Sequence, residues 1–191
     1  DLVGRYAKLV SNYSIWLLTA RRLYASANII GKEIRRRWDD QDFRKPDDKK
    51  NLILDAYDVS DFQPTFMMLA ASALENLFKA HVVRQNAPRF RQIVLDTGEL
   101  PKELRTHDLR KLAKSCAINI EGDVGSRLDR LAKFSTWRGR YHFARKFETF
   151  YHLTAQNDKP SSGIAFKSTD TQDIPQFLQS LANALGLDFN K

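Results

Sequence analysis

The densest group of residues that could do chemistry lies between residues 127 and 152. Seven basic residues and two acidic ones occur there, which gives this stretch a charge of +5. Aromatic residues alternate with the bases; they are Phe134, Trp137, Tyr141, Phe143, Phe147, Phe150 and Tyr151. Because cations neutralise phosphates and aromatic rings stack on unpaired bases, the pattern is typical of a single-stranded nucleic acid site. The alternative is that the rings belong to a core and the bases to the solvated face of the same helices.

The whole chain is basic, and it contains one cysteine. Lys and Arg number 31 against 23 Asp and Glu, so the net charge is +8, which favours anionic partners. With Cys116 alone, neither an intramolecular disulfide nor a cysteine-rich zinc site can form. Cys116 shares helical spacing with Leu109, Leu112 and Ala113, which favours a small buried core residue over a reactive thiol.

Common catalytic motifs are absent from the sequence. We find no phosphate-binding loop, dinucleotide glycine fingerprint, His-Glu-x-x-His or nucleophile elbow. The four histidines, His81, His107, His142 and His152, have no metal-ligand spacing, although folding could still gather three of them. We therefore expect no cofactor and no metal.

Size and composition predict one domain covering residues 1–191. The chain has 191 residues and a mass of 22.1 kDa, and 42% of its residues are hydrophobic, enough for a packed core. Its apolar runs, such as residues 66–71, are much shorter than the roughly 20 residues of a membrane span. No signal peptide is apparent, and a single cysteine suits a reducing compartment, so we expect a cytoplasmic protein with no membrane contact.

The elements that would carry these residues are helices. Only 8 glycines and 6 prolines occur, and apolar residues recur three and four apart, which predicts an all-α bundle of about five to seven helices. The first helix is expected over residues 2–38, with Gly31 as a candidate break. Residues 39–51 are strongly charged and predict a loop, and residues 52–57 have no clear assignment.

Further helices are expected along the rest of the chain. Ser60 and Gln63 have capping-box spacing, which predicts a helix over residues 61–85, and Pro88 begins a shorter one. Thr106 is expected to cap the helix that carries Cys116. Another helix carries Leu128, Leu131 and Phe134, and its aromatic continuation runs to Leu153. Residues 156–170 predict a loop, and the last helix spans residues 171–185, with Gly186 at its C-terminal end.

Three stretches, taken in order, resemble the HEPN superfamily. They are residues 71–81, an alanine-rich helix with Glu and Lys; residues 106–112, with His-x-Leu-x-x-Leu; and residues 128–142, with Leu-x-x-Leu leading into Gly-Arg-Tyr. The resemblance covers about residues 64–153, with the first and last helices as additions. It implies a small, often dimeric helical bundle and, in many members, a metal-independent ribonuclease of bacterial defence or toxin–antitoxin systems.

The resemblance also implies an active-site pair, an arginine followed after four to six residues by a histidine. Arg145 and His152 fit this spacing, and two helical turns would place them on one face. The histidine would move a proton for the attacking 2′-hydroxyl, and the arginine would hold the phosphate. Arg138, Arg140 and His142 are then the candidate contacts to the RNA phosphates, with histidine where relatives carry the proline of Arg-Tyr-Pro.

Two further residues are secondary candidates. His107 precedes a predicted helix, so it either makes an end-of-helix hydrogen bond or takes part in catalysis. Glu75 lies on an otherwise apolar helix, where we expect it to be the buried partner of an arginine, such as Arg140, rather than a general base.

The sequence therefore predicts a HEPN-like protein that binds or cleaves RNA, as a metal-independent endoribonuclease. The expected partners are single-stranded or transfer RNA, a second copy of the chain in a homodimer, and an antitoxin or other protein. The alternative is a non-catalytic HEPN-like module for dimerisation or protein interaction.

Overall fold

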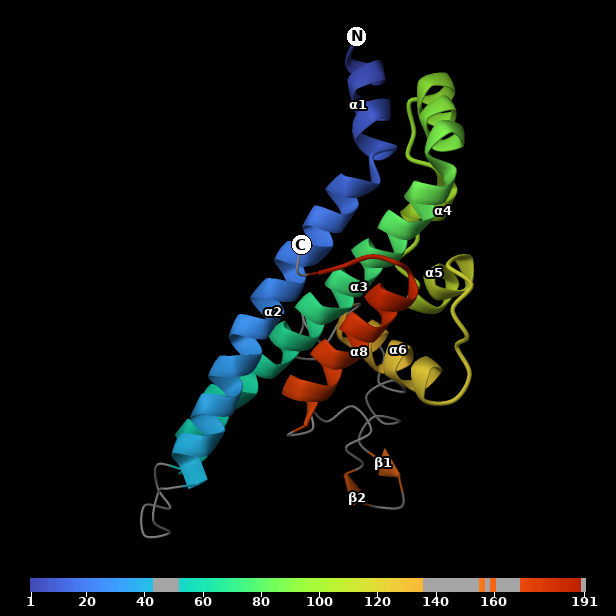
Figure 1. Ribbon diagram of the computed structural model, residues 1–191. Coiled ribbons are helices and arrows are strands. Elements are labelled where there is room, and N and C mark those ends of the chain that lie inside the picture. The colour runs from blue at the N-terminus through green and yellow to red at the C-terminus, as the bar shows by residue number, and fades with distance from the viewer. Residues whose placement is uncertain (43–51, 136–154, 157–158, 161–168, 190–191) are drawn as a thin grey trace.

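The computed structural model describes residues 1–42, 52–135, 155–156, 159–160 and 169–189. It is an all-α helical bundle, as the sequence predicts (Figure 1). The elements are α1 (Leu2–Val10), α2 (Tyr13–Asp42), α3 (Leu52–Thr97), α4 (Lys102–Arg105), α5 (Leu109–Ser115), α6 (Asp123–Lys133), β1 (Ala155–Gln156), β2 (Lys159–Pro160) and α8 (Asp170–Ala184). The two strands form a two-residue antiparallel ladder at the start of the predicted loop, residues 156–170, with Ala155 just before it.

Helices α2 and α3 run side by side and form the frame of the bundle (Figure 1). The buried face of α2 includes the small residues Ala20, Ala27 and Gly31, and α3 contributes buried alanines such as Ala70 and Ala73. Small side chains let two helix backbones approach closely. Helical spacing predicts that the core face of α3 consists of Phe66, Leu69, Ala70, Ala73, Leu74, Leu77, Phe78 and Val82. All of these are buried except Leu69, which is only partly buried.

The first helix breaks earlier than the sequence predicts. The break lies at Ser11 and Asn12, where the Asn12 side chain accepts a hydrogen bond from the Ser14 backbone N–H at 3.0 Å. Gly31 continues the helix, so its assignment as a break is wrong. A Cβ atom on Gly31 would lie 2.9 Å from Cε2 of Phe66, so the glycine makes room for an aromatic ring of α3.

Helix α3 also begins earlier than predicted. It starts at Leu52, so residues 52–57 are helical, and the predicted start at residue 61 with Ser60 as the cap is wrong. Pro64 removes one backbone hydrogen bond, a loss that the long packing against α2 outweighs.

Near the other end of α3, Asn86 leaves helical geometry (φ −126°, ψ 16°) two residues before Pro88, where the sequence predicts a second helix. At this kink the Asn86 side chain donates a hydrogen bond to the Val82 carbonyl at 2.9 Å, which gives that carbonyl a partner.

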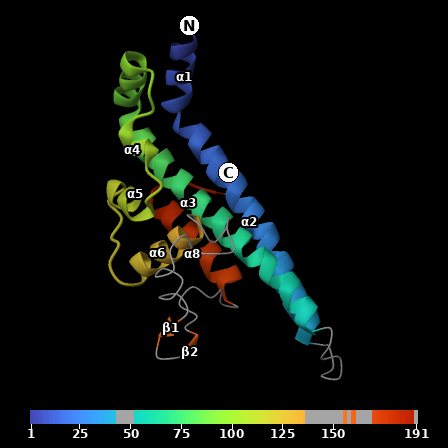
Figure 2. The ribbon, with the colours of Figure 1, turned by 180° about the vertical axis from the view of Figure 1, so that it is seen from behind.

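The smaller helices cover α3. Helices α5 and α6 lie on its side away from α2, as the reverse view shows (Figure 2), and α8 packs against both α2 and α3. Their buried residues join one continuous core with those of α1, α2 and α3. Gly186 (φ 62°) ends α8 as predicted, because the Leu187 N–H bonds to the Ala182 carbonyl in a Schellman motif. Within the described residues, no helix has the length and apolarity to cross a membrane.

Candidate functional site

Helix α3 carries an ion pair that is almost completely removed from solvent. Glu75 and Lys79 are one helical turn apart, and the Lys79 ammonium lies 2.7 Å from Oε1 of Glu75. Only 5% of the Lys79 side chain and 14% of the Glu75 side chain are exposed. The ammonium also lies 5.7 Å from the centre of the Trp16 ring of α2. A buried charge is costly without such partners, so these residues stabilise one another only as a group.

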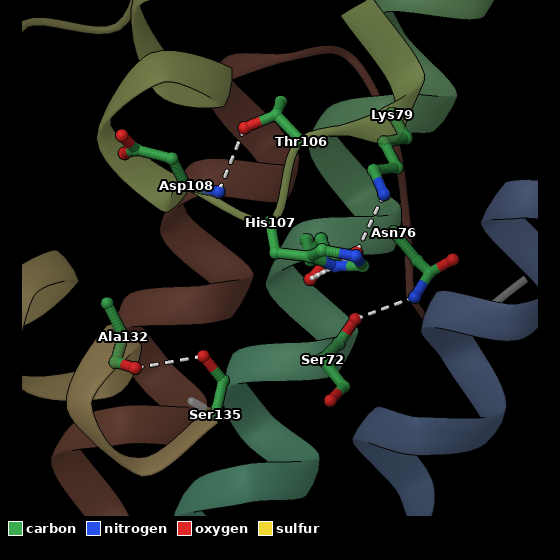
Figure 3. Close-up of polar contacts among 9 residues, drawn as sticks. Ser72, Asn76, Lys79, Thr106, His107, Asp108, Ala132 and Ser135 are labelled. Carbon is green, nitrogen blue, oxygen red and sulfur yellow. Dashed lines mark hydrogen bonds and ion pairs between the residues drawn. The ribbon is translucent and has the colours of Figure 1, made fainter. Parts of the chain in front are cut away.

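His107 completes this group from the connection between α4 and α5. Its neighbours fix the local backbone: Asp108 caps α5 by accepting from the Lys111 N–H at 3.1 Å, and Thr106 Oγ1 accepts from the Asp108 N–H at 3.1 Å (Figure 3). The prediction that Thr106 caps this helix is therefore wrong, because the cap lies two residues later. The His107 side chain takes no part in capping α5, and its ring points toward α3 beside Lys79 (Figure 3).

The imidazole of His107 is oriented by Glu75. Nδ1 lies 3.0 Å from Oε1 and 3.2 Å from Oε2 of the carboxylate. Because a carboxylate accepts hydrogen bonds, Nδ1 carries the proton and donates it, and the lone pair of the neutral ring is on Nε2. The His107 side chain is 74% exposed, and Nε2 bonds to no described residue. A carboxylate that fixes the tautomer of an accessible imidazole is an arrangement suited to proton transfer.

Glu75 has two bonding partners among the described residues, Lys79 and His107. The arginine suggested for it, Arg140, lies outside those residues, so that pair stays a prediction. His107 makes its bond across to α3 instead of at the end of a helix. The remaining site predictions, Arg138, Arg140, His142, Arg145 and His152, lie outside the described residues, whose central part ends at Ser135 just after α6.

Lys79 and Trp16 are members of this group that the sequence reasoning missed. The spacing of Glu75 and Lys79 at i and i+4 is a signal for their ion pair. No local pattern places Trp16 beside them, because it lies more than fifty residues earlier on α2.

The sequence reasoning also missed a second buried ion pair, between Arg130 of α6 and Asp170 at the start of α8. This pair joins the two helices, with one contact of 2.6 Å.

Two other titratable groups are buried but have no access to a substrate. Burial raises the pKa of the Cys116 thiol to about 12, which confirms the prediction of a core residue. Burial, followed by the positive charge of Arg84, lowers the pKa of His81. Across the part of the chain that the structure describes, no three His, Cys, Asp or Glu side chains are grouped to hold a metal ion.

Comparison of the chain with protein-family models, curated proteins and solved structures gave no match. The HEPN resemblance therefore rests on the three sequence stretches alone and stays a prediction.

Proposed function

We propose that this chain is a HEPN-like protein that binds RNA and cleaves it without a metal ion. The observation that carries the proposal is His107, an exposed imidazole whose Nδ1 is held by Glu75 and whose Nε2 is open to a substrate. The net charge of +8 favours an anionic substrate, and the sequence resemblance favours RNA.

The chemistry fits RNA because RNA supplies its own nucleophile. Nε2 of His107 accepts the proton of a 2′-hydroxyl while the 2′-oxygen attacks the adjacent phosphorus. The bond from phosphorus to the 5′-oxygen breaks, and the leaving oxygen takes up a proton. The products are a 2′,3′-cyclic phosphate and a 5′-hydroxyl. No metal-bound water has to be generated, because the nucleophile is already part of the substrate.

The sequence-predicted residues would take the remaining roles in this scheme. With His107 as the base for the 2′-hydroxyl, the role that the resemblance implies for His152, His152 becomes our candidate for the acid that protonates the 5′-oxygen. Arg145 is our candidate for the cation that holds the phosphate. Arg138, Arg140 and His142 would hold the neighbouring phosphates.

Cleavage assays in a chelator test the proposal. We expect the wild-type chain to cut labelled single-stranded or transfer RNA and to leave cyclic phosphate ends. His107→Ala and His152→Ala should each lower the rate at least about 100-fold while circular dichroism stays unchanged. Because His107 is exposed, added imidazole should restore part of the rate of His107→Ala, an effect that a purely structural role would not produce. A loss confined to His142→Ala would instead move the site to the Gly-Arg-Tyr stretch.

Binding measurements separate RNA recognition from catalysis. If phosphate contacts dominate, the affinity for RNA should fall steeply and linearly on a log–log scale as salt rises. A folded wild-type chain that neither cleaves RNA nor binds it in this salt-dependent way would refute the proposal. The second candidate, a non-catalytic protein-interaction module, is favoured by the exposed apolar face of α2 described next.

A further inference from the structure

Helix α2 has two faces with the same spacing of residues. Its inner seam, which faces α3, consists of Leu17, Ala20, Tyr24, Ala27 and Gly31. A second set of residues, which we call the outer stripe, lies two positions before each residue of the inner seam. It consists of Ile15, Leu18, Arg22, Ala25 and Ile29. A shift of two residues is a rotation of about 200°, so the outer stripe lies opposite the inner seam. Steps of three and four residues are the pattern of a helix that packs along another helix.

The outer stripe is open to solvent. Its three large apolar side chains are exposed, with Leu18 at 45% and Ile29 at 69%, and Arg22 and Ala25 are exposed as well. In both ribbon views α2 lies along one edge of the described bundle (Figures 1 and 2). The stripe runs from Ile15 to Ile29, fourteen steps along the helix, which is a length of about 21 Å, or two heptads.

The charges within this stripe are basic. From Ile15 to Ile29 the helix carries two arginines, Arg21 and Arg22, and no acidic residue. The first acidic residue beyond it, Glu33, is already paired with Arg36 and Arg37. Arg22 lies at the centre of the stripe and makes no salt bridge with any described residue. The surface is therefore complementary to an apolar ridge bordered by carboxylates.

The same charges argue against a second copy of the chain. Arg22 is the midpoint between Ile15 and Ile29, so both a parallel in-register pair and a centred antiparallel pair would place Arg22 against its own counterpart. Like charges at such a contact oppose association. A membrane surface fits less well, because the stripe is narrow and is flanked along its length by the short side chains Ser14, Thr19 and Ser26.

We propose that the outer stripe of α2 is a docking surface for an amphipathic helix of a partner protein that carries acidic residues beside its apolar seam. A partner carboxylate would pair with Arg22, and apolar side chains would cover Leu18 and Ile29. This inference is independent of the RNA proposal, because none of its residues belongs to the group around His107.

Three synthetic helical peptides test this surface. Each carries about three heptads with the same isoleucine and leucine seam, bordered by glutamate, glutamine or lysine. Binding to the full chain is measured by fluorescence anisotropy. We expect the glutamate peptide to bind at least about tenfold more tightly than the glutamine peptide, and the lysine peptide most weakly. Equal binding of the three peptides, or none by any, would overturn the proposal.

Matched variants then locate the site. Leu18→Glu should weaken binding of the glutamate peptide at least about tenfold, whereas Leu95→Glu should not, although Leu95 on α3 is a leucine of similar exposure, 40%. Arg22→Glu should reverse the preference, so that the lysine peptide becomes the tightest. Equal losses in Leu18→Glu and Leu95→Glu would contradict the assignment.

Two further outcomes would assign the stripe to another occupant and so overturn the proposal. Sedimentation could show a wild-type dimer that Leu18→Glu converts to a monomer. Vesicles containing phosphatidylserine could bind the wild type and not Leu18→Glu, while the glutamate peptide does not bind.

Discussion

Replacing Glu75 and Lys79 one at a time and together would measure the interactions that position His107. The variants are Glu75→Leu, Lys79→Met and the double variant, each of which keeps approximately the original side-chain size. In the wild type the two charges are 14% and 5% exposed, so neither can be rehydrated without moving α3 or its neighbours. Removing one charge therefore leaves the other buried with fewer partners.

The two single variants should differ in cost. Breaking a buried ion pair costs about 3–5 kcal/mol, because the remaining charge is uncompensated. In Glu75→Leu the Lys79 ammonium keeps only its contact with the Trp16 ring, and such a contact offsets up to about 2 kcal/mol of the cost. We therefore expect the free energy of unfolding to fall by about 2–4 kcal/mol. In Lys79→Met the carboxylate keeps its hydrogen bond from His107, so we expect only about 1–2 kcal/mol. The double variant buries no charge and should lie within about 1 kcal/mol of the wild type.

Urea titrations followed by circular dichroism at pH 7 give the required free energies of unfolding. We expect the double variant to be less destabilised than the sum of the single variants by at least about 2 kcal/mol. The control is Asp123 with Arg127, a pair of the same spacing but higher exposure, whose variants should cost less than about 1 kcal/mol. Additive costs at Glu75 and Lys79 would refute the reasoning that they act as one buried group.

Four further predictions concern burial and backbone strain. The lowered pKa of His81 means that the folded chain holds this ring neutral more strongly than the unfolded chain does. Stability should therefore fall as the pH drops below the unfolded value of 6.5, and urea titrations should show less of this loss in His81→Gln; equal losses would contradict it. Cys116, whose pKa burial raises to about 12, should react with a disulfide reagent at pH 8 at least about a hundredfold more slowly in the native than in the unfolded chain, and equal rates would contradict its burial. Ala117 ends α5 with φ 57°, so Ala117→Gly should raise the free energy of unfolding by about 0.5–1 kcal/mol. Gly125→Ala should lower it by about 1–3 kcal/mol, because the new Cβ would lie 2.2 Å from the Ile120 carbonyl oxygen. The same urea titration measures both variants, and a change of the opposite sign in either would show the backbone reasoning to be wrong.

The sequence predicts the fold best where the deciding signal is local. The apolar faces of α3 and α8 follow from helical spacing, because Phe78 and Leu181 repeat with their neighbours every three or four residues. Gly186 could be predicted as a helix end because its positive φ is decided within one turn. The predicted break at Gly31 and the predicted helix start at residue 61 are wrong because contacts between α2 and α3, which no local pattern shows, keep both positions within helices.

The candidate site could be predicted only in part, for the same reason. Glu75 and His107 are recognisable as chemically capable residues, but 32 positions separate them, and nothing in either neighbourhood indicates that they bond. Lys79 looks like one more solvated lysine until the packing of Trp16 over it is known. Lys79 is a partner of Glu75 that the helix itself supplies, because the i and i+4 neighbour is already in place when the helix forms.

The way in which α8 is attached has a consequence for the order of folding. Helices α2 and α3 are adjacent in sequence, so their pairing closes a short loop, and we expect it to form early. Helix α8 is held by bonds across much longer separations, from Arg35 to the Thr171 carbonyl and from Arg21 to the Asp188 carbonyl, 136 and 167 residues apart. During synthesis, the faces of α2 and α3 that α8 covers therefore stay uncovered until residues 170–184 have emerged. In that interval the unfinished protein presents apolar surface that a chaperone could bind.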